Sequence, residues 1–104
     1  MIVEQGVLSV RPGQEAAFED AMADARSIIA AMPGFIRLQV SRGIERPSTY
    51  LLIVEWDTLE HHTEGFRGSP EYEVWRADLH HFYDPFPVIE HFEPVAGIAA
   101  LDTL

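Results

Sequence analysis

The chain has 104 residues and a formal net charge of −10, and 47% of its residues are hydrophobic, which is typical of one globular domain. So acidic a chain repels phosphate backbones and anionic bilayers, so neither nucleic acid nor a membrane is expected as a partner. The sequence contains no Cys, which excludes disulfides, thiolate nucleophiles and Cys-ligated metals.

Targeting signals are not evident in the sequence. Glu4 and Gln5 interrupt the first apolar residues, so no secretory signal is expected. No stretch reaches the ~18 apolar residues of a membrane span. We therefore expect a soluble, cytoplasmic protein with one domain at residues 1–95 and a C-terminal tail at residues 96–104.

The first two elements are a strand and a helix. Residues 2–10 are dense in β-branched side chains. Gly6 among them indicates a bulge or a close approach of something to the backbone, and a bulge is favoured over a ligand contact. A helix is predicted over residues 14–32, before Pro33-Gly34. Its apolar residues recur three and four apart and indicate a core-facing stripe: Phe18, Met22, Ala25, Ile29 and Met32.

A hairpin follows the helix. In residues 35–41, apolar side chains alternate with polar ones, and the predicted inward set is Ile36, Leu38 and Val40. After a loop at residues 42–48, residues 49–56 form the strongest predicted strand, with apolar side chains on both faces. Leu51 and Ile53 face one side, and Tyr50, Leu52, Val54 and Trp56 face the other. Both faces must then be covered, one by helices and the other by a second sheet or a partner chain, which indicates a dimer.

The second helical region is broken in two. Residues 57–66 can begin a helix that Gly65 weakens, and a second helix starts at Ser69-Pro70, with Ser69 as its N-cap. Its predicted inward stripe is Tyr72, Trp75, Leu79 and Phe82, with Arg76, His80 and Tyr83 on the flank. A last strand is predicted over residues 88–93.

The order of elements is therefore β-α-β-β-α-β. This order is typical of the split βαβ or ferredoxin-like plait, an α+β fold in which helices cover one face of a four-stranded antiparallel sheet. The uncovered face would be buried if two such sheets packed together.

Candidate chemistry gathers in the segment from Trp56 to His80. We expect a pocket between the sheet and the two helices, built from Trp56, His62, Phe66, Tyr72, Trp75, Arg76 and His80. Mostly apolar walls with a few polar groups are typical of small-molecule sites. In such a pocket Arg76 can stabilise an enolate or phenolate, and His62 or His80 can take a proton. The alternative is that the rings are only core and that Arg76 pairs with Glu73 or Glu55 at the surface.

Other chemistry finds little support. The five His lack the spacing and the Glu of a zinc helix, and neither a G-x-S-x-G nucleophile motif nor a phosphate-binding glycine loop is present. We expect no metal and no cofactor.

Several segments, in order, resemble the antibiotic biosynthesis monooxygenase family of dimeric α+β barrels over residues 2–95. They are VLSVRPGQEAAF at 7–18, PGFI at 33–36, LLIVEW at 51–56, FRGSPEY at 66–72 and IEHFEPV at 89–95. The resemblance implies a homodimer with a pocket between each sheet and its helices. It also implies oxidation of a phenol- or quinol-type aromatic by O₂ without metal, flavin or haem. An electron-rich phenolate can itself reduce O₂, so the protein has to deprotonate, orient and stabilise it.

The resemblance is incomplete at the family's site positions. Trp56 matches the pocket aromatic that closes the third strand, and Arg76 matches a basic residue on the last helix. His62 stands where the polyketide-oxidising type often has Tyr, and Leu52 stands where Asn is expected. These departures put the substrate type in doubt.

The haem-degrading branch resembles the chain less. Its Asn, Trp and axial His correspond to Gly6, Phe66 and Arg76, which leaves only His80, one turn further on, as a ligand candidate. Three functions stay open: a cofactor-independent monooxygenase, a non-catalytic dimeric module that binds a small hydrophobic ligand, and an isomerase or lyase with a His base.

Overall fold

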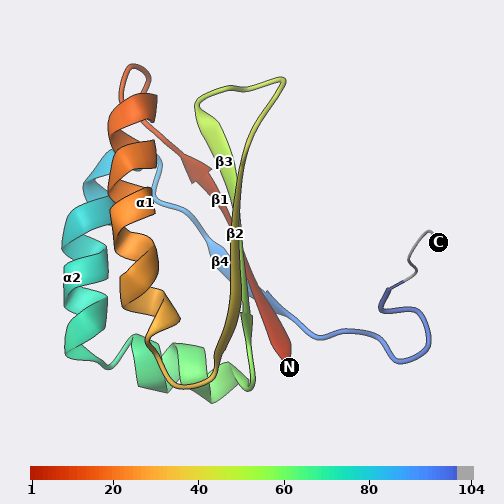
Figure 1. The fold of residues 1–104 in the computed structure, drawn as a ribbon. Coiled ribbons are helices and arrows are strands. Elements are labelled where there is room, and N and C mark those ends of the chain that lie inside the picture. The colour runs from red at the N-terminus through yellow and green to blue at the C-terminus, as the bar shows by residue number, and fades with distance from the viewer. Residues whose placement is uncertain (101–104) are drawn as a thin grey trace.

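The structure, a computed structural model, describes residues 1–100. Its four antiparallel strands are β1 (Ile2–Ser9), β2 (Phe35–Arg42), β3 (Thr49–Trp56) and β4 (Ile89–Phe92), in the order β2-β3-β1-β4. Figure 1 shows α1 (Glu15–Ala30) and α2 (Pro70–Leu79) together on one face of this sheet. Two short helical segments, η1 (His61–Phe66) and η2 (His80–Phe82), flank α2. The predicted ferredoxin-like α+β plait is confirmed.

The core lies between α1, α2 and the covered face of the sheet. The predicted stripe of α1 is confirmed, since Phe18, Met22, Ala25 and Ile29 are buried and Met32 packs against them. Phe18 lies at the centre of an aromatic cluster, with ring centroids 4.8 Å from Tyr50 and 5.8 Å from Phe82. Burying a large apolar side chain contributes about 1.5–3 kcal/mol, so this stripe fixes α1 on the sheet.

The strand β3 has the two apolar faces that were predicted. Tyr50, Leu52, Val54 and Trp56 are buried under the helices, while Leu51 and Ile53 are half-buried on the other side. The apolar side chains on that helix-free face of the sheet are Val3, Val7, Leu51, Ile53 and Phe92. Val7 is 46% exposed and Phe92 is 47% exposed, so this face is partly bare in the single chain.

The predicted alternation of β2 is wrong at its first residues. A β-bulge between Phe35 and Arg37 shifts the register against β3, so that Phe35 faces the core and Ile36 is 46% exposed. A bulge inserts one extra residue and thereby reverses the facing of those before it. Leu38 and Val40 keep their predicted inward positions.

The bulge predicted at Gly6 is also wrong. Gly6 pairs in unbroken register with Leu52 on one side and Ile89 on the other. A Cβ at this position would lie 2.5 Å from Cδ1 of Ile89. The absent side chain therefore makes room for Ile89, which packs directly over the backbone of β1.

The second helical region has the predicted break. In η1 the turn is wide, and the Arg67 N–H donates to the carbonyl of His62, five residues earlier, at 3.0 Å. Ser69 then caps α2, because its Oγ accepts from the N–H of Tyr72 at 3.1 Å, and Pro70 occupies the first helical position. The predicted stripe of this helix is confirmed, with Trp75, Leu79 and Phe82 buried.

After β4 the chain leaves the sheet and runs away from the body of the molecule (Figure 1). Val95 and Ile98 are 59% and 78% exposed on this segment. Residues 101–104, the end of the predicted tail, lie outside the described residues. Across residues 1–100, none of the helices is both long and apolar enough to cross a membrane.

Candidate functional site

A cavity of about 420 Å³ opens between the sheet, η1, α2 and the segment after α2. The residues that line it are Glu4, Leu8, Leu52, His62, Phe66, Arg67, Tyr72, Trp75, His80, Tyr83, Phe86, Pro87 and Ile89. Its volume lies in the range of small-molecule sites, and its walls have the usual mixture of aromatic rings and a few polar groups.

The structure brings most of the predicted site residues to this cavity. His62, Phe66, Tyr72, Trp75 and His80 all line it. The rings form a connected wall, in which Phe66 meets Tyr72 and Trp75 edge to face, with centroids 5.2 and 5.7 Å away. The connection from η1 through the turn to α2 places Phe66, Tyr72 and Trp75 on one side of the cavity.

Two predicted residues lie elsewhere. Trp56 is completely buried behind the cavity wall, where its ring stacks on that of His62 at a centroid distance of 5.6 Å and an angle of 16°. Arg76 is exposed on α2 and does not line the cavity. Glu55 pairs with Arg37 at 3.8 Å, and within residues 1–100 no ion pair joins Arg76 to Glu55 or Glu73. The role predicted for Arg76 stays a prediction.

Glu4 is the central polar residue that the sequence reasoning missed. It is 6% exposed, and its Oε1 accepts a hydrogen bond from Trp56 Nε1 at 3.0 Å and lies 3.3 Å from His62 Nε2. Its Oε2 has no hydrogen-bond partner within residues 1–100, and no side-chain oxygen or nitrogen there is both fully buried and unpaired. Oε2 is therefore open to the cavity.

A second histidine extends this arrangement. Nδ1 of His62 lies 2.8 Å from Nε2 of His91 on the edge strand β4, and the two rings are 5.0 Å apart between centroids. His62 is 2% exposed, whereas His91 is partly exposed. Nδ1 of His62 is thus hydrogen-bonded to His91, Nε2 lies beside Glu4, and the three side chains of Glu4, His62 and His91 form one cluster.

Burial controls the ionisation of these groups. It raises the pKa of Glu4, an effect that the Trp56 hydrogen bond and the positive charge of Arg67 oppose. Burial lowers the pKa of His62 to about 3, with Arg67 and His91 adding to the shift. His62 is therefore neutral at physiological pH, and its 3.3 Å contact with Glu4 is not an ion pair.

The remaining polar groups lie nearer the mouth. Burial lowers the pKa of His80, and the nearby Arg76 lowers it further. Burial also raises the pKa of Tyr83. Arg67 is exposed at the rim and contributes the positive charge that was expected from Arg76.

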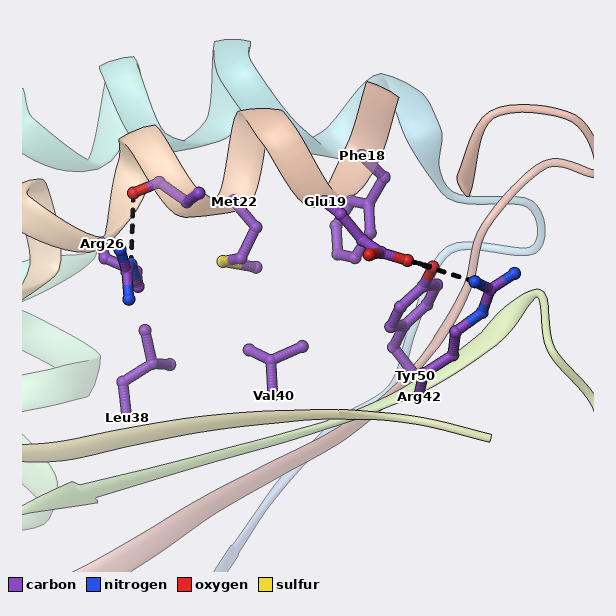
Figure 2. Close-up of a pocket in the computed structure, with 9 residues that line it drawn as sticks. Phe18, Glu19, Met22, Arg26, Leu38, Val40, Arg42 and Tyr50 are labelled. Carbon is purple, nitrogen blue, oxygen red and sulfur yellow. Dashed lines mark hydrogen bonds and ion pairs between the residues drawn. The ribbon is translucent and has the colours of Figure 1, made fainter. Parts of the chain in front are cut away.

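A second cleft, of about 390 Å³, lies between α1 and the β2 side of the sheet. Figure 2 shows Met22, Leu38 and Val40 between its two polar ends. At one end, Tyr50 donates to Glu19, which also pairs with Arg42 at 3.5 Å. At the other end, Arg26 donates to the carbonyl of Ala23 at 3.2 Å. The carboxylate here, Glu19, is half exposed, whereas Glu4 is buried beside a wall of aromatic rings, so the cavity of Glu4 is the better candidate site.

Comparisons with known proteins identify the family of the chain. The family model of antibiotic biosynthesis monooxygenase matches residues 1–78. The uncharacterized protein YczJ of Bacillus subtilis (strain 168) is 52% identical over 95 residues, which are 91% of this chain and all of YczJ.

Solved structures give the same result. A Bordetella bronchiseptica protein named for this family superposes with a TM-score of 0.86 and 33% identity, over 90% of this chain and 96% of its own. SnoaB from Streptomyces nogalater, a cofactor-independent oxygenase, shares the fold with a TM-score of 0.74 and 20% identity, over 95% and 97% of the two chains. The chain belongs to the antibiotic biosynthesis monooxygenase family.

Proposed function

We propose that this chain is a cofactor-independent monooxygenase that oxidises a small phenol- or quinol-type aromatic with O₂ in the cavity of Glu4. The observation that carries the proposal is a buried carboxylate with one free oxygen, Oε2, inside a cavity walled by aromatic rings. The family membership supports the reaction type, as does the shared fold with SnoaB.

The first step is removal of the phenolic proton. A phenol has a pKa near 10, far above that of an ordinary Glu, so proton transfer to an ordinary carboxylate is unfavourable. Burial raises the pKa of Glu4 and so narrows this gap. Glu4 Oε2 accepts the proton, the charge of Arg67 at the rim stabilises the phenolate, and Phe66, Tyr72 and Trp75 hold its ring.

The second step is oxidation by O₂. The phenolate donates one electron to O₂, and the resulting radical pair combines into a carbon–oxygen bond, which gives a hydroperoxide after protonation. Loss of water then breaks the O–O bond and leaves a carbonyl. The substrate loses two hydrogens and gains one oxygen atom, and the second oxygen leaves as water. The chain supplies position, a base and charge.

The proposal includes a homodimer formed through the helix-free face of the sheet. Val3, Val7, Leu51, Ile53 and Phe92 lie on that face, and their alternation along the strands is what a buried sheet face requires. Packing against a second copy removes this apolar surface from water, which stabilises the dimer by about 25 cal/mol for each Å² of apolar surface buried. The family membership agrees with this arrangement.

A binding module without turnover is the second candidate. One observation favours it. Within residues 1–100, each fully buried side-chain nitrogen or oxygen already has a hydrogen-bond partner in the protein without a ligand. An isomerase or lyase with His62 or His80 as its base has less support, because burial lowers the pKa of both, that of His62 to about 3, and a histidine with a lowered pKa is a weaker base.

The test is O₂ uptake by the metal-stripped protein with a panel of quinols and anthrone-like phenols. Arg67→Ala and Arg76→Ala are compared, since the first removes a cavity residue and the second the residue that the family resemblance implies. Val74→Ala, on the exposed side of α2, is the matched control. The proposal is supported if the wild type takes up O₂ faster than the spontaneous rate and Arg67→Ala lowers this uptake. Binding of panel members without any uptake favours the binding module.

A further inference from the structure

Tyr83 brings a hydroxyl group to the cavity of Glu4. The residue is 7% exposed and lines this cavity. A buried tyrosine hydroxyl usually has a hydrogen-bond partner, but within residues 1–100 the hydroxyl of Tyr83 has none. No side-chain oxygen in that part of the chain is both fully buried and unpaired, so this hydroxyl borders open space. Because Tyr83 lines the cavity, its hydroxyl is open to it.

The backbone and the ring of Tyr83 are both held in place. Tyr83 forms an isolated β-bridge with Val10, and the N–H of Asp84 donates to the carbonyl of Ser9 at 2.8 Å. The ring meets that of Phe18 edge to face, with the centroids 5.9 Å apart. The hydroxyl is therefore presented from a fixed position, and a ligand that contacts it loses little free energy in ordering the side chain.

Glu4 and Tyr83 lie at opposite ends of the cavity. Tyr83 pairs with Val10, which is six residues beyond Glu4 along the same run of chain. A strand rises about 3.3 Å per residue, so the two backbone positions are about 20 Å apart along the sheet, and the side chains reach inward from them. The cavity residues on the sheet between these positions are all apolar: Leu8, Leu52 and Ile89.

The two ends have opposite hydrogen-bonding character. The ionised carboxylate of Glu4 only accepts hydrogen bonds, whereas the hydroxyl of Tyr83 has a proton to donate. Burial raises the pKa of Tyr83, so the hydroxyl keeps this proton at physiological pH. A ligand that satisfies both ends has an acidic hydroxyl at one end and an oxygen with a free lone pair at the other.

We propose that Tyr83 is a specificity-determining residue whose hydroxyl donates a hydrogen bond to a second oxygen of the substrate, at the end away from the hydroxyl that Glu4 deprotonates. The substrate class is thereby narrowed to phenols that carry an oxygen at each end of the ring system. A phenol without the second oxygen leaves the buried donor unpaired and is bound less well. The proposal deepens the proposed function, on which it rests for the position of the reacting hydroxyl.

The test is calorimetric titration under argon, where neither ligand can be oxidised, with 2,6-dihydroxynaphthalene and 2-naphthol. The first has an oxygen at each end, and the second lacks one of them. The quantity compared is the ratio of the two dissociation constants, 2-naphthol over the diol. This ratio is expected to be roughly 2- to 10-fold higher in the wild type than in Tyr83→Phe, which keeps the ring and removes the donor.

Tyr50→Phe is the matched control. Tyr50 is also buried, but its hydroxyl donates to Glu19 and it does not line this cavity. Tyr50→Phe is therefore expected to keep the wild-type ratio. The proposal is overturned if Tyr83→Phe keeps that ratio, if Tyr50→Phe lowers it equally, or if the wild type binds neither naphthol.

Thermal unfolding checks the premise that the hydroxyl of Tyr83 is unpaired. Tyr83→Phe removes no hydrogen bond within the protein, so it should unfold at or above the wild-type temperature. A variant that fails to fold would show that the hydroxyl has a structural partner, which also overturns the proposal. The titration needs no turnover. A ratio that Tyr83→Phe lowers, without O₂ uptake by the wild type, retains the recognition by Tyr83 and refutes the oxygenase, and O₂ uptake with an unchanged ratio does the reverse.

Discussion

Trp56 and Glu4 are joined across two neighbouring strands by a 3.0 Å hydrogen bond from the indole Nε1 to the carboxylate Oε1. Trp56 is the direct partner of Ile2, so Glu4 lies two residues further along β1 on the same face. The bond fixes one oxygen of the carboxylate and leaves the other open to the cavity. The buried tryptophan thus acts as a positioning residue for Glu4.

Trp56→Phe is expected to destabilise the fold by more than the loss of side-chain volume alone would. It removes the indole donor from a buried carboxylate, and leaving such a group with one partner fewer costs about 1–3 kcal/mol. Urea unfolding at neutral pH measures the change. Trp75→Phe is the matched control, since Trp75 is also buried but donates no side-chain hydrogen bond within residues 1–100. Equal losses in the two variants would contradict a structural role for the bond.

His62 is expected to make the protein sensitive to acid. Because its pKa is lowered to about 3 in the folded state, the unfolded chain binds its proton more readily below the ordinary value of 6.5. Stability is therefore lost as the pH falls from 6.5 towards 3, by up to about 4 kcal/mol at about 1.4 kcal/mol per pKa unit.

Unfolding curves of wild type, His62→Gln and His81→Gln across this range test the assignment. His62→Gln should flatten the pH dependence, and His81→Gln, at an exposed histidine, should not. Glu4 acts in the opposite sense, because its raised pKa makes its contribution fall as the pH rises above 4.5. An unchanged slope in His62→Gln would show that other groups cause the acid sensitivity.

Gly34→Ala is expected to destabilise the turn that leads from α1 to β2. Gly34 has a positive φ of 82°, and an added Cβ would lie 2.2 Å from the ring of His61. Gly13→Ala is the control, because Gly13 has a φ of 89° but no atom within 4 Å of such a Cβ. In both variants an Ala has to adopt a positive φ, which costs about 1 kcal/mol or more. Only Gly34→Ala adds a clash, with the ring of His61. Thermal unfolding of the two variants should therefore differ.

Ile53→Lys is expected to dissociate the proposed homodimer. It places a charge at the middle of the helix-free face of the sheet, where burial of an unpaired ammonium costs several kcal/mol. Sedimentation velocity measures the result. Ile44→Lys, at an 88% exposed position in the β2–β3 loop, should leave the dimer intact. A monomeric wild type would refute the proposed dimer itself.

The sequence pattern was sufficient to predict the fold and the aromatic wall of the cavity. Helical spacing placed Trp75 and Leu79 in the core, and alternation placed Trp56 and Leu52 under the helices, because burial follows directly from periodicity. It failed at Ile36, because a bulge depends on pairing with β3 and leaves no clear local signal. It failed at Gly6 for the same reason, since the side chain that fills the space comes from β4.

The polar part of the site was harder to predict. An acidic residue at an inward position of β1, in phase with Gly6, Leu8 and Val10, was a signal that could have identified Glu4. Its partners, Trp56 and His62, come from segments more than fifty residues away, and only the folded sheet brings them together. Helical position and the family resemblance both favour Arg76, but the cavity opens on the side of Tyr72 and Trp75, and Arg67 lines it instead.

Tyr72→Leu is expected to weaken the binding of an aromatic substrate without removing the base. Contacts between aromatic rings contribute about 0.5–1.5 kcal/mol, so kcat/KM for O₂ uptake should fall roughly 2- to 10-fold. Val74→Leu, on the exposed side of the same helix, should behave like wild type. Equal rates in Tyr72→Leu and wild type would place the substrate outside this cavity.

The most direct measurement is kcat for O₂ uptake by Glu4→Gln beside wild type, with the best quinol or phenol of the panel. Loss of a general base lowers a rate by typically about 10²- to 10⁴-fold, and this loss is predicted for Glu4→Gln. Glu90→Gln, which removes an exposed carboxylate from β4, should keep the wild-type rate. Equal turnover by Glu4→Gln and wild type would contradict the assignment of Glu4 as the base.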